Sequence, residues 1–252
     1  MTLTPEQLAQ FDRDGYLFFP GLFTPEETQT LNDAVPELYE RREDYNVREK
    51  GKDAVRTNFA AHMYSEPFAK LARHPRMIEP VEELLGEKLY MHQFKINGKM
   101  AFEGDVWQWH QDYGTWLNDD LMPTERAMNV AIFLDDVTEH NGPLMFIPGS
   151  HKKGVVDAKH DLTTTSYPLW TVDNDLIRQL VQRAGGKKGG IVSPQRPGRF
   201  DDSVSLVPGA CLRQQPVALQ SRGGLFEPVR CEQPHPPPQA PRVHCAPRFH
   251  AD

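Results

Sequence analysis

The stretch VWQWHQDYGTW, residues 106–116, places a histidine and an aspartate two positions apart among four aromatic side chains. Aromatic and β-branched residues favour strands, so we predict a strand over residues 105–113. Residues i and i+2 of a strand project from the same face, so the side chains of His110 and Asp112 would lie together. In a helix they would diverge by about 200°, since each residue turns the chain by about 100°.

An imidazole and a carboxylate on one face are two of the three ligands of a 2-His-1-carboxylate triad, which holds non-haem Fe(II). We therefore predict a metal site at His110 and Asp112. A hydrogen-bonded His–Asp pair without metal is the alternative, because this spacing also occurs often by chance. Four aromatic side chains are expected to wall the site and exclude water: Trp107, Trp109, Tyr113 and Trp116.

The segments before this stretch predict helices, and those after it predict short strands. A Thr-Pro pair with Gln or Glu three residues after the threonine is typical of a helix start, so we predict helices that begin at Pro5 and Pro25. Two short helices are expected within residues 67–86, and residues 41–60 are expected to be mostly loop. Strand-like segments, separated by Gly, Pro, Asn and Asp, follow at 89–97, 105–113, 127–137 and 142–150. This order predicts an α+β fold with a mainly β core, built around an antiparallel sheet or barrel.

Composition limits the partners that we expect. The chain has 252 residues and a formal net charge of -7, which suits one domain or one domain plus a tail and argues against nucleic acid. It contains no apolar run long enough to span a membrane, and its first residues lack the pattern of a secretory signal. All three cysteines lie between residues 211 and 245, so a disulfide framework is not expected and a cytoplasmic location is.

Three segments together resemble the phytanoyl-CoA dioxygenase family, most closely its bacterial ectoine hydroxylase-like branch. They are FDRDGYLFFPGLFTPEE (11–27), the His-x-Asp pair, and NGPLMFIPGSH (141–151), and the likeness covers residues 8 to about 192. The resemblance implies a double-stranded β-helix (jelly-roll, cupin-like) core preceded by N-terminal helices. It also implies an Fe(II)- and 2-oxoglutarate-dependent dioxygenase, which uses O2 to hydroxylate a small-molecule metabolite and releases succinate and CO2.

The resemblance also assigns roles to individual positions. Related halogenases have a small residue in place of the carboxylate, so the presence of Asp112 implies hydroxylation, or another oxidation, rather than halogenation. Gln93 and Asn97 are expected to face the same way on one strand. The implied assignments are His110 and Asp112 as catalytic iron ligands, Gln93, Asn97 and Asn129 at 2-oxoglutarate, and Lys95 and Trp116 at the substrate. The turn at residues 147–151 is expected to be structural, as are six other histidines: His62, His74, His92, His140, His151 and His160.

Residues 194–252 depart from the pattern of the preceding sequence. They contain 11 of the 22 prolines and every cysteine, and no lysine follows Lys188. We therefore expect an oxygenase domain over 1–193 with an incomplete jelly roll. A Pro- and Arg-rich tail over 194–252 is expected to be disordered, with the C-terminal strands missing or disrupted.

The family needs a second histidine, and an arginine about ten residues after it, between about 205 and 225. That stretch has no histidine; Arg222 lies near the expected arginine, and His235, His244 and His250 are poor candidates in the Pro-rich part. We hypothesise that the reading frame changes near residues 195–198. Codons chosen for 199–217, read one base later, can encode a strand and a histidine. A natural Pro-rich tail is the alternative.

Two further functional hypotheses remain beside the oxygenase. One is a catalytically impaired cupin-like binding protein, a degenerate relative that keeps the pocket without the distal histidine. The other is a zinc hydrolase on the same fold, which is disfavoured because neither a third ligand nor a general base is visible. The sequence does not identify the substrate or the oligomeric state, although Lys95 and Trp116 suit a small polar or zwitterionic molecule by analogy with one branch of the family.

Overall fold

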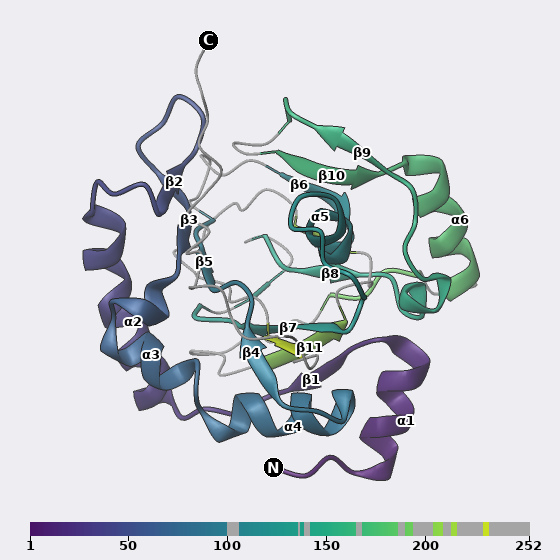
Figure 1. Ribbon diagram of the computed structural model, residues 1–252, viewed down its shortest axis with the longest axis horizontal. Helices are drawn as coiled ribbons and strands as arrows, with labels where there is room; N and C mark the ends of the chain where they lie inside the picture. Colours follow the sequence, from purple (N-terminus) through teal and green to yellow (C-terminus); the bar gives the residue numbers. More distant parts are fainter. Residues whose placement is uncertain are drawn as a thin grey trace.

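The computed structural model describes residues 1–99, 106–135, 137–138, 142–164, 168–185 and 190–193, together with the strands within 204–208, 213–215 and 229–231. Two five-stranded antiparallel sheets form two layers of the molecule, and a smaller sheet lies at one side (Figure 1). The first sheet has the order β1 (Leu17–Phe19), β11 (Val204–Pro208), β7 (Ala127–Ile132), β13 (Val229–Cys231), β4 (Leu89–Met91). The second has the order β8 (Met145–Phe146), β12 (Arg213–Gln215), β6 (Trp107–His110), β10 (Leu169–Val172), β9 (Ala158–Asp161). The small sheet is β2 (Asn46–Arg48), β3 (Val55–Phe59), β5 (Lys95–Asn97).

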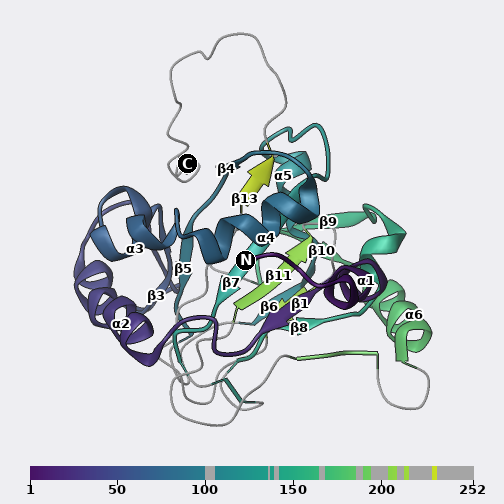
Figure 2. The same cartoon turned by 90° about the horizontal axis from the view of Figure 1, so that it is seen from below.

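Helices cover the outside of these layers. In both views α4 runs along the first sheet with α1 near it, and α6 lies beside the β9–β10 edge of the second (Figures 1 and 2). The α-helices are α1 (Pro5–Asp14), α2 (Pro25–Glu40), α3 (Glu66–Leu71), α4 (Pro75–Leu85), α5 (Asp112–Asn118) and α6 (Asn174–Gly185). Two short 3-10 helices are η1 (Ala61–Met63) and η2 (Ser150–Lys153). Among the described helices, none combines the length and the apolar character needed to cross a membrane.

The N-terminal helix predictions are confirmed. Thr4 and Thr24 each form a capping box, in which the threonine side chain and the residue three positions later satisfy each other's backbone N–H groups. The two short helices predicted in 67–86 are α3 and α4, and α4 ends at Gly86 with a φ of 73°. Local capping chemistry therefore defines the start or the end of these elements.

Strand β7 separates the helix-covered core from the interior between the sheets. All six of its residues are buried, as expected for a central strand with both faces covered. Met128, Val130 and Ile132 belong to the main hydrophobic cluster, which the helices also enter. The alternate residues include Ala131, which joins a second cluster, and Asn129, which faces the candidate site.

Three sequence predictions differ in detail from the structure. Residues 41–60 are mostly loop, as predicted, but they also contain β2 and β3, which pair antiparallel and which the sequence did not predict. Strand β3 was missed because it buries polar residues, Arg56, Thr57 and Asn58, in place of an apolar alternation. The strand predicted over 89–97 is two strands in different sheets, and the strand predicted over 105–113 ends at His110.

The region 194–252, where we expected missing or disrupted strands, contributes three strands of three to five residues. β11 pairs with β1 and β7, and β13 pairs with β7 and β4. β12 pairs with β6 in an irregular register between Arg213 and Gln215. The other residues of this region lie outside the described part of the chain, so the division of the chain at 193 and 194 stays a prediction.

Candidate active site

His110 and Asp112 meet at the junction between a strand and a helix. His110 is the last residue of β6, Gln111 has extended backbone with φ -107° and ψ 131°, and Asp112 is the first residue of α5. The two side chains therefore do not share a strand face, as the sequence had suggested. The turn still brings His110 Nε2 to 3.4 Å from Asp112 Oδ1, with the side chains only 3% and 8% exposed.

Hydrogen bonds fix the orientation of both side chains. His110 Nδ1 lies 2.6 Å from the carbonyl oxygen of Gln108, so in the neutral ring Nδ1–H donates and Nε2 keeps its lone pair. Asn129 Nδ2 donates to Asp112 Oδ2, which leaves Oδ1 directed at the imidazole. A lone pair and a carboxylate oxygen that face each other in a buried place repel unless a cation or a proton lies between them. The pair therefore fits two ligands of one metal ion, each held by an outer partner.

Two asparagines add unpartnered polar atoms to the interior. Asn97, on β5, accepts a hydrogen bond from Thr57 Oγ1 at 2.9 Å, while its Nδ2 has no partner among the described residues. Asn129 Oδ1 is likewise buried and has no partner in that part of the chain. Buried polar groups are rarely left unpaired in a finished site, so both atoms indicate a bound ligand or water. Asn97 and Asn129 are two of the three residues that the sequence assigned to 2-oxoglutarate.

The remaining assigned residues are arranged around α5 and β5. The sequence predicted that Gln93 and Asn97 share a strand. Gln93 instead lies in the loop between β4 and β5, and only Asn97 is on β5. Gln93 Oε1 accepts a hydrogen bond from Trp116 Nε1 at 3.3 Å, so Gln93 and Trp116 lie together. Lys95 lies on β5, with its ammonium nitrogen 5.7 Å from the ring centroid of Phe59.

One of the four aromatic residues expected to wall the site was wrongly placed. Trp109 packs in a cluster with Ile147, Val172 and Ile177, on the side of β6 that α6 covers. Its neighbour His110 projects to the opposite side, as alternation along a strand requires. Trp107 lies closer, with its ring centroid 6.4 Å from that of His110. The other two form a small cluster with residues of the following loop and strand: Tyr113, Trp116, Met122 and Ala127.

The turn at residues 147–151 has the geometry of a structural element. Gly149 has a φ of 73°, and its N–H donates to the carbonyl oxygen of Asp14 at 2.8 Å. His151 Nε2 lies 3.1 Å from the carbonyl oxygen of Asp12. The segment thus satisfies carbonyl groups at the C-terminal end of α1, which supports the structural interpretation.

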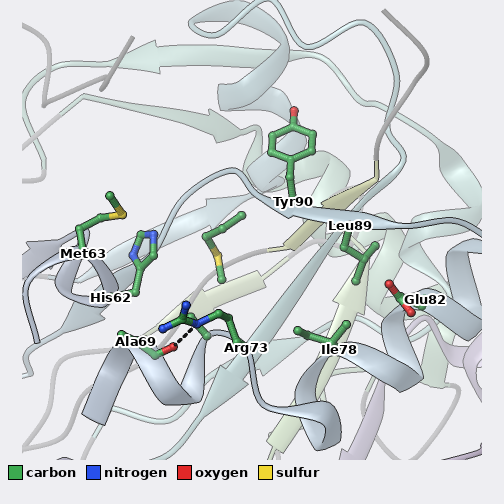
Figure 3. A pocket seen from close by; sticks show the side chains of 10 residues that line it. His62, Met63, Ala69, Arg73, Ile78, Glu82, Leu89 and Tyr90 are labelled. Carbon is green, nitrogen blue, oxygen red and sulfur yellow. Dashed lines mark hydrogen bonds between the residues drawn. The ribbon is translucent and has the colours of Figure 1, made fainter. Parts of the chain in front are cut away.

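A pocket of about 540 Å³ lies elsewhere, between α3, α4, η1 and β4 (Figure 3). Leu89 points from β4 toward α4, while Tyr90 points to the other side of the strand (Figure 3). Burial and the charge of Arg73 lower the pKa of His62 at its edge. The pocket contains none of the predicted site residues. Its lining is His62, Met63, Ala69, Ala72, Arg73, Ile78, Glu82, Leu89, Tyr90 and Met91.

Within the described residues, no group of three or more His, Cys, Asp or Glu side chains could hold a metal ion. His110 and Asp112 are thus a two-ligand set in this part of the chain. The histidines His235, His244 and His250, and also Arg222, lie outside the described residues. Sequence reasoning missed two residues that contact the site: Thr57, which orients Asn97, and His92, which contacts Trp116.

The two facing sheets and the buried His–Asp pair define a jelly-roll, double-stranded β-helix protein with a candidate non-haem metal centre. The family model for phytanoyl-CoA dioxygenase (PhyH) matches residues 11–192, so the chain belongs to that family. This confirms the resemblance inferred from the sequence.

Two of the similar proteins are a hydroxylase and a dioxygenase. The L-proline trans-4-hydroxylase of Streptomyces griseoviridis is 40% identical over 149 residues, which is 59% of this chain and 56% of the relative. The ectoine dioxygenase of Bordetella bronchiseptica is 34% identical over 194 residues, which is 73% of this chain and 63% of the relative. The chain therefore spans less than two thirds of the length of either relative.

A solved structure is similar over most of the chain. The crystal structure of EctD from S. alaskensis with 2-oxoglutarate and 5-hydroxyectoine matches with a TM-score of 0.76 and 30% identity, covering 91% of this chain and 76% of that chain. EctD has also been solved with bound Fe.

Proposed function

We propose that this chain is an Fe(II)- and 2-oxoglutarate-dependent dioxygenase that uses O2 to hydroxylate a small molecule. The observation that carries the proposal is the buried pair His110 and Asp112, whose Nε2 and Oδ1 atoms face each other at 3.4 Å. Membership of the phytanoyl-CoA dioxygenase family supports it, as does similarity to a structure that contains 2-oxoglutarate.

Each residue near the pair then has a role. His110 and Asp112 would hold the metal, and Gln108 and Asn129 would keep them aimed at it. Asn97 Nδ2 is an unpartnered donor among the described residues and suits an oxygen of 2-oxoglutarate; Asn129 Oδ1 suits a donor such as water. When bound, Fe(II) and 2-oxoglutarate would supply the oxidising chemistry for C–H hydroxylation, with succinate and CO2 as products. The protein would supply position and a water-poor interior.

The substrate in this proposal is a small polar or zwitterionic metabolite. Trp116 and Gln93, which share a hydrogen bond, would form one wall of the substrate side, and Lys95 would add a positive charge. The named substrates of the relatives, L-proline and ectoine, are the first compounds to test. The carboxylate of Asp112 favours hydroxylation over halogenation, because it would bind the metal at the place that a halide would need.

The test is succinate release from 2-oxoglutarate in the presence of Fe(II) and O2, measured with and without each candidate substrate. We expect substrate-dependent succinate from the wild-type chain and its loss in His110→Ala. The matched control is His160→Ala, which removes an exposed histidine on β9 that stacks on Trp170. Equal succinate release from the wild-type protein and His110→Ala would contradict the proposal.

A second candidate is a cupin-like binding protein that binds a ligand near His110 and Asp112 but does not catalyse a reaction. It is favoured by one observation: the part of the chain that the structure describes contains no third metal ligand beside His110 and Asp112. It predicts that 2-oxoglutarate raises the melting temperature while no succinate forms with any substrate. Asn97→Leu, which removes the unpartnered donor, should abolish that thermal shift if the compound binds at this site.

A further inference from the structure

His92 lies in the loop between β4 and β5, and it contacts Trp116 of α5 and Asp120, which lies two residues beyond the end of this helix. Its Nε2 is 2.9 Å from Asp120 Oδ2, and the two side chains are 16% and 25% exposed. Its ring meets the ring of Trp116 edge-on, with centroids 5.6 Å apart and an interplanar angle of 80°. His92 therefore links a carboxylate and an aromatic side chain that are four residues apart.

The residue after His92 makes the complementary contact. Gln93 Oε1 accepts the indole N–H of Trp116 at 3.3 Å, so two consecutive residues of one loop contact this side chain. The indole is large and almost fully buried, and it belongs to the cluster of Tyr113 and Met122. An edge-on imidazole and a hydrogen bond to the indole together define the tilt of the ring and its position.

A third contact restrains the same end of α5 through Asp119. Trp170, on β10, donates its indole N–H to Asp119 Oδ1 at 2.9 Å. Asp119 and Asp120 are thus bound from two different elements, directly after a helix of seven residues that begins with Asp112. The Trp170 contact is a natural comparison for His92, because its hydrogen bond reaches the end of α5 at Asp119 and its ring stacks on His160 of β9.

We propose that His92 is a positioning residue. It sets the orientation of Trp116 against Gln93 on the substrate side of the site, and it ties that orientation to the end of α5 through Asp120. This proposal rests on the proposed function only in the statement that Trp116 borders the substrate. The geometry of the contact itself does not depend on catalysis.

The first test reads the indole N–H of Trp116 directly in a two-dimensional ¹H–¹⁵N spectrum. The chain has four tryptophans, so four indole signals are expected, and Trp116→Phe assigns the relevant one. His92→Leu should shift the Trp116 signal. Trp170→Phe should lower stability in a comparable way while the Trp116 signal stays in place. An unmoved signal in His92→Leu, or an equal shift in Trp170→Phe, would overturn the proposal.

The second test separates positioning from general loosening in the reaction. With the substrate found in the succinate assay, His92→Leu should raise KM at least about threefold while kcat changes by less than about twofold. Asp120→Asn keeps a hydrogen-bond acceptor for His92, and it should retain most of the wild-type KM. Equal losses in kcat for His92→Leu and Trp170→Phe would refute a positioning role. A wild-type chain that forms no succinate contradicts the proposed function, whereas the spectrum still decides the role of His92.

Discussion

The buried ion pair between Arg56 and Glu49 makes a strong prediction about stability. Arg56 Nη1 lies 3.2 Å from Glu49 Oε1, and the two side chains are 1% and 2% exposed. Coulomb attraction at this distance is about 5 kcal/mol with an effective dielectric constant of about 20, but desolvation of both ions offsets most of it. Removing only the carboxylate leaves Arg56 buried without this counter-charge. Glu49→Gln should therefore cost about 3–5 kcal/mol, a large part of the total stability of an ordinary domain.

Urea denaturation, monitored by tryptophan fluorescence, measures this loss as a change in the urea concentration at the unfolding midpoint, with a constant m-value. The double variant Glu49→Leu/Arg56→Met should recover at least half of it, because no charge remains buried. Full recovery is not expected, because the Arg56 guanidinium also lies 4.6 Å from the ring centroid of Trp107. The control is the exposed pair Glu66–Lys70, with side chains 79% and 72% exposed, where Glu66→Gln should cost less than about 0.5 kcal/mol. A loss below about 1 kcal/mol in Glu49→Gln would refute the reasoning.

Three smaller predictions concern the N-terminal helices and the turn that contacts α1. Thr24→Ala removes the capping box of α2 and should cost about 1 kcal/mol in urea denaturation, whereas Thr30→Ala, on the exposed side of the same helix, should cost less. Gly149→Ala places a side chain at a φ of 73° and should cost about 1–2 kcal/mol; an unchanged midpoint would contradict the geometry. Burial lowers the pKa of His151 below the ordinary 6.5. The unfolded chain then binds more protons, so stability should fall as the pH drops below about 6.5, and His151→Gln should reduce the slope of melting temperature against pH between 7.5 and 5.5.

The sequence predicted best those features that local chemistry determines. The capping boxes at Thr4 and Thr24 and the helix end at Gly86 depend on residues within one or two turns, so their patterns are visible in the chain itself. The pairing of His110 with Asp112 was predicted for the wrong geometric reason. The strand ends at His110, and a single extended residue and a helix start bring the carboxylate back to the imidazole.

Features that depend on tertiary contacts were harder to predict. Strand β3 buries polar residues whose partners lie on other segments, Glu49 for Arg56, Asn97 for Thr57 and Asn46 for Asn58, so hydrophobic periodicity gave no signal there. Trp109 packs against residues of α6, whereas its neighbour His110 projects from the other face of β6. The sequence could not predict which face α6 covers, because that depends on tertiary packing. The sequence predicted only a structural role for His92, because its partners Trp116 and Asp120 lie more than twenty residues away along the chain.

The strands of the tail that pair with the site strands do not supply a histidine as the third metal ligand. Strand β11 places Val207 opposite Asn129, and β12 places Arg213 opposite His110. None of the residues in the three tail strands is a histidine, so the backbone that pairs with the site strands does not bring the expected ligand to them. An iron site needs that ligand from another position, or a different sequence in this region.

The gene sequence across the codons for Val192 to Leu212 decides between these outcomes, and metal affinity checks the result in the protein. If a base is absent or extra, the frame-corrected chain should gain the histidine and bind Co(II), a spectroscopic stand-in for Fe(II), at least about tenfold more tightly than the chain with the present tail. His110→Ala should then remove binding in the corrected chain. If the present frame is confirmed and Co(II) binding is weak and insensitive to His110→Ala, the pair at 3.4 Å does not hold a metal ion in this chain. The cupin-like binding protein would then be the better description of this chain.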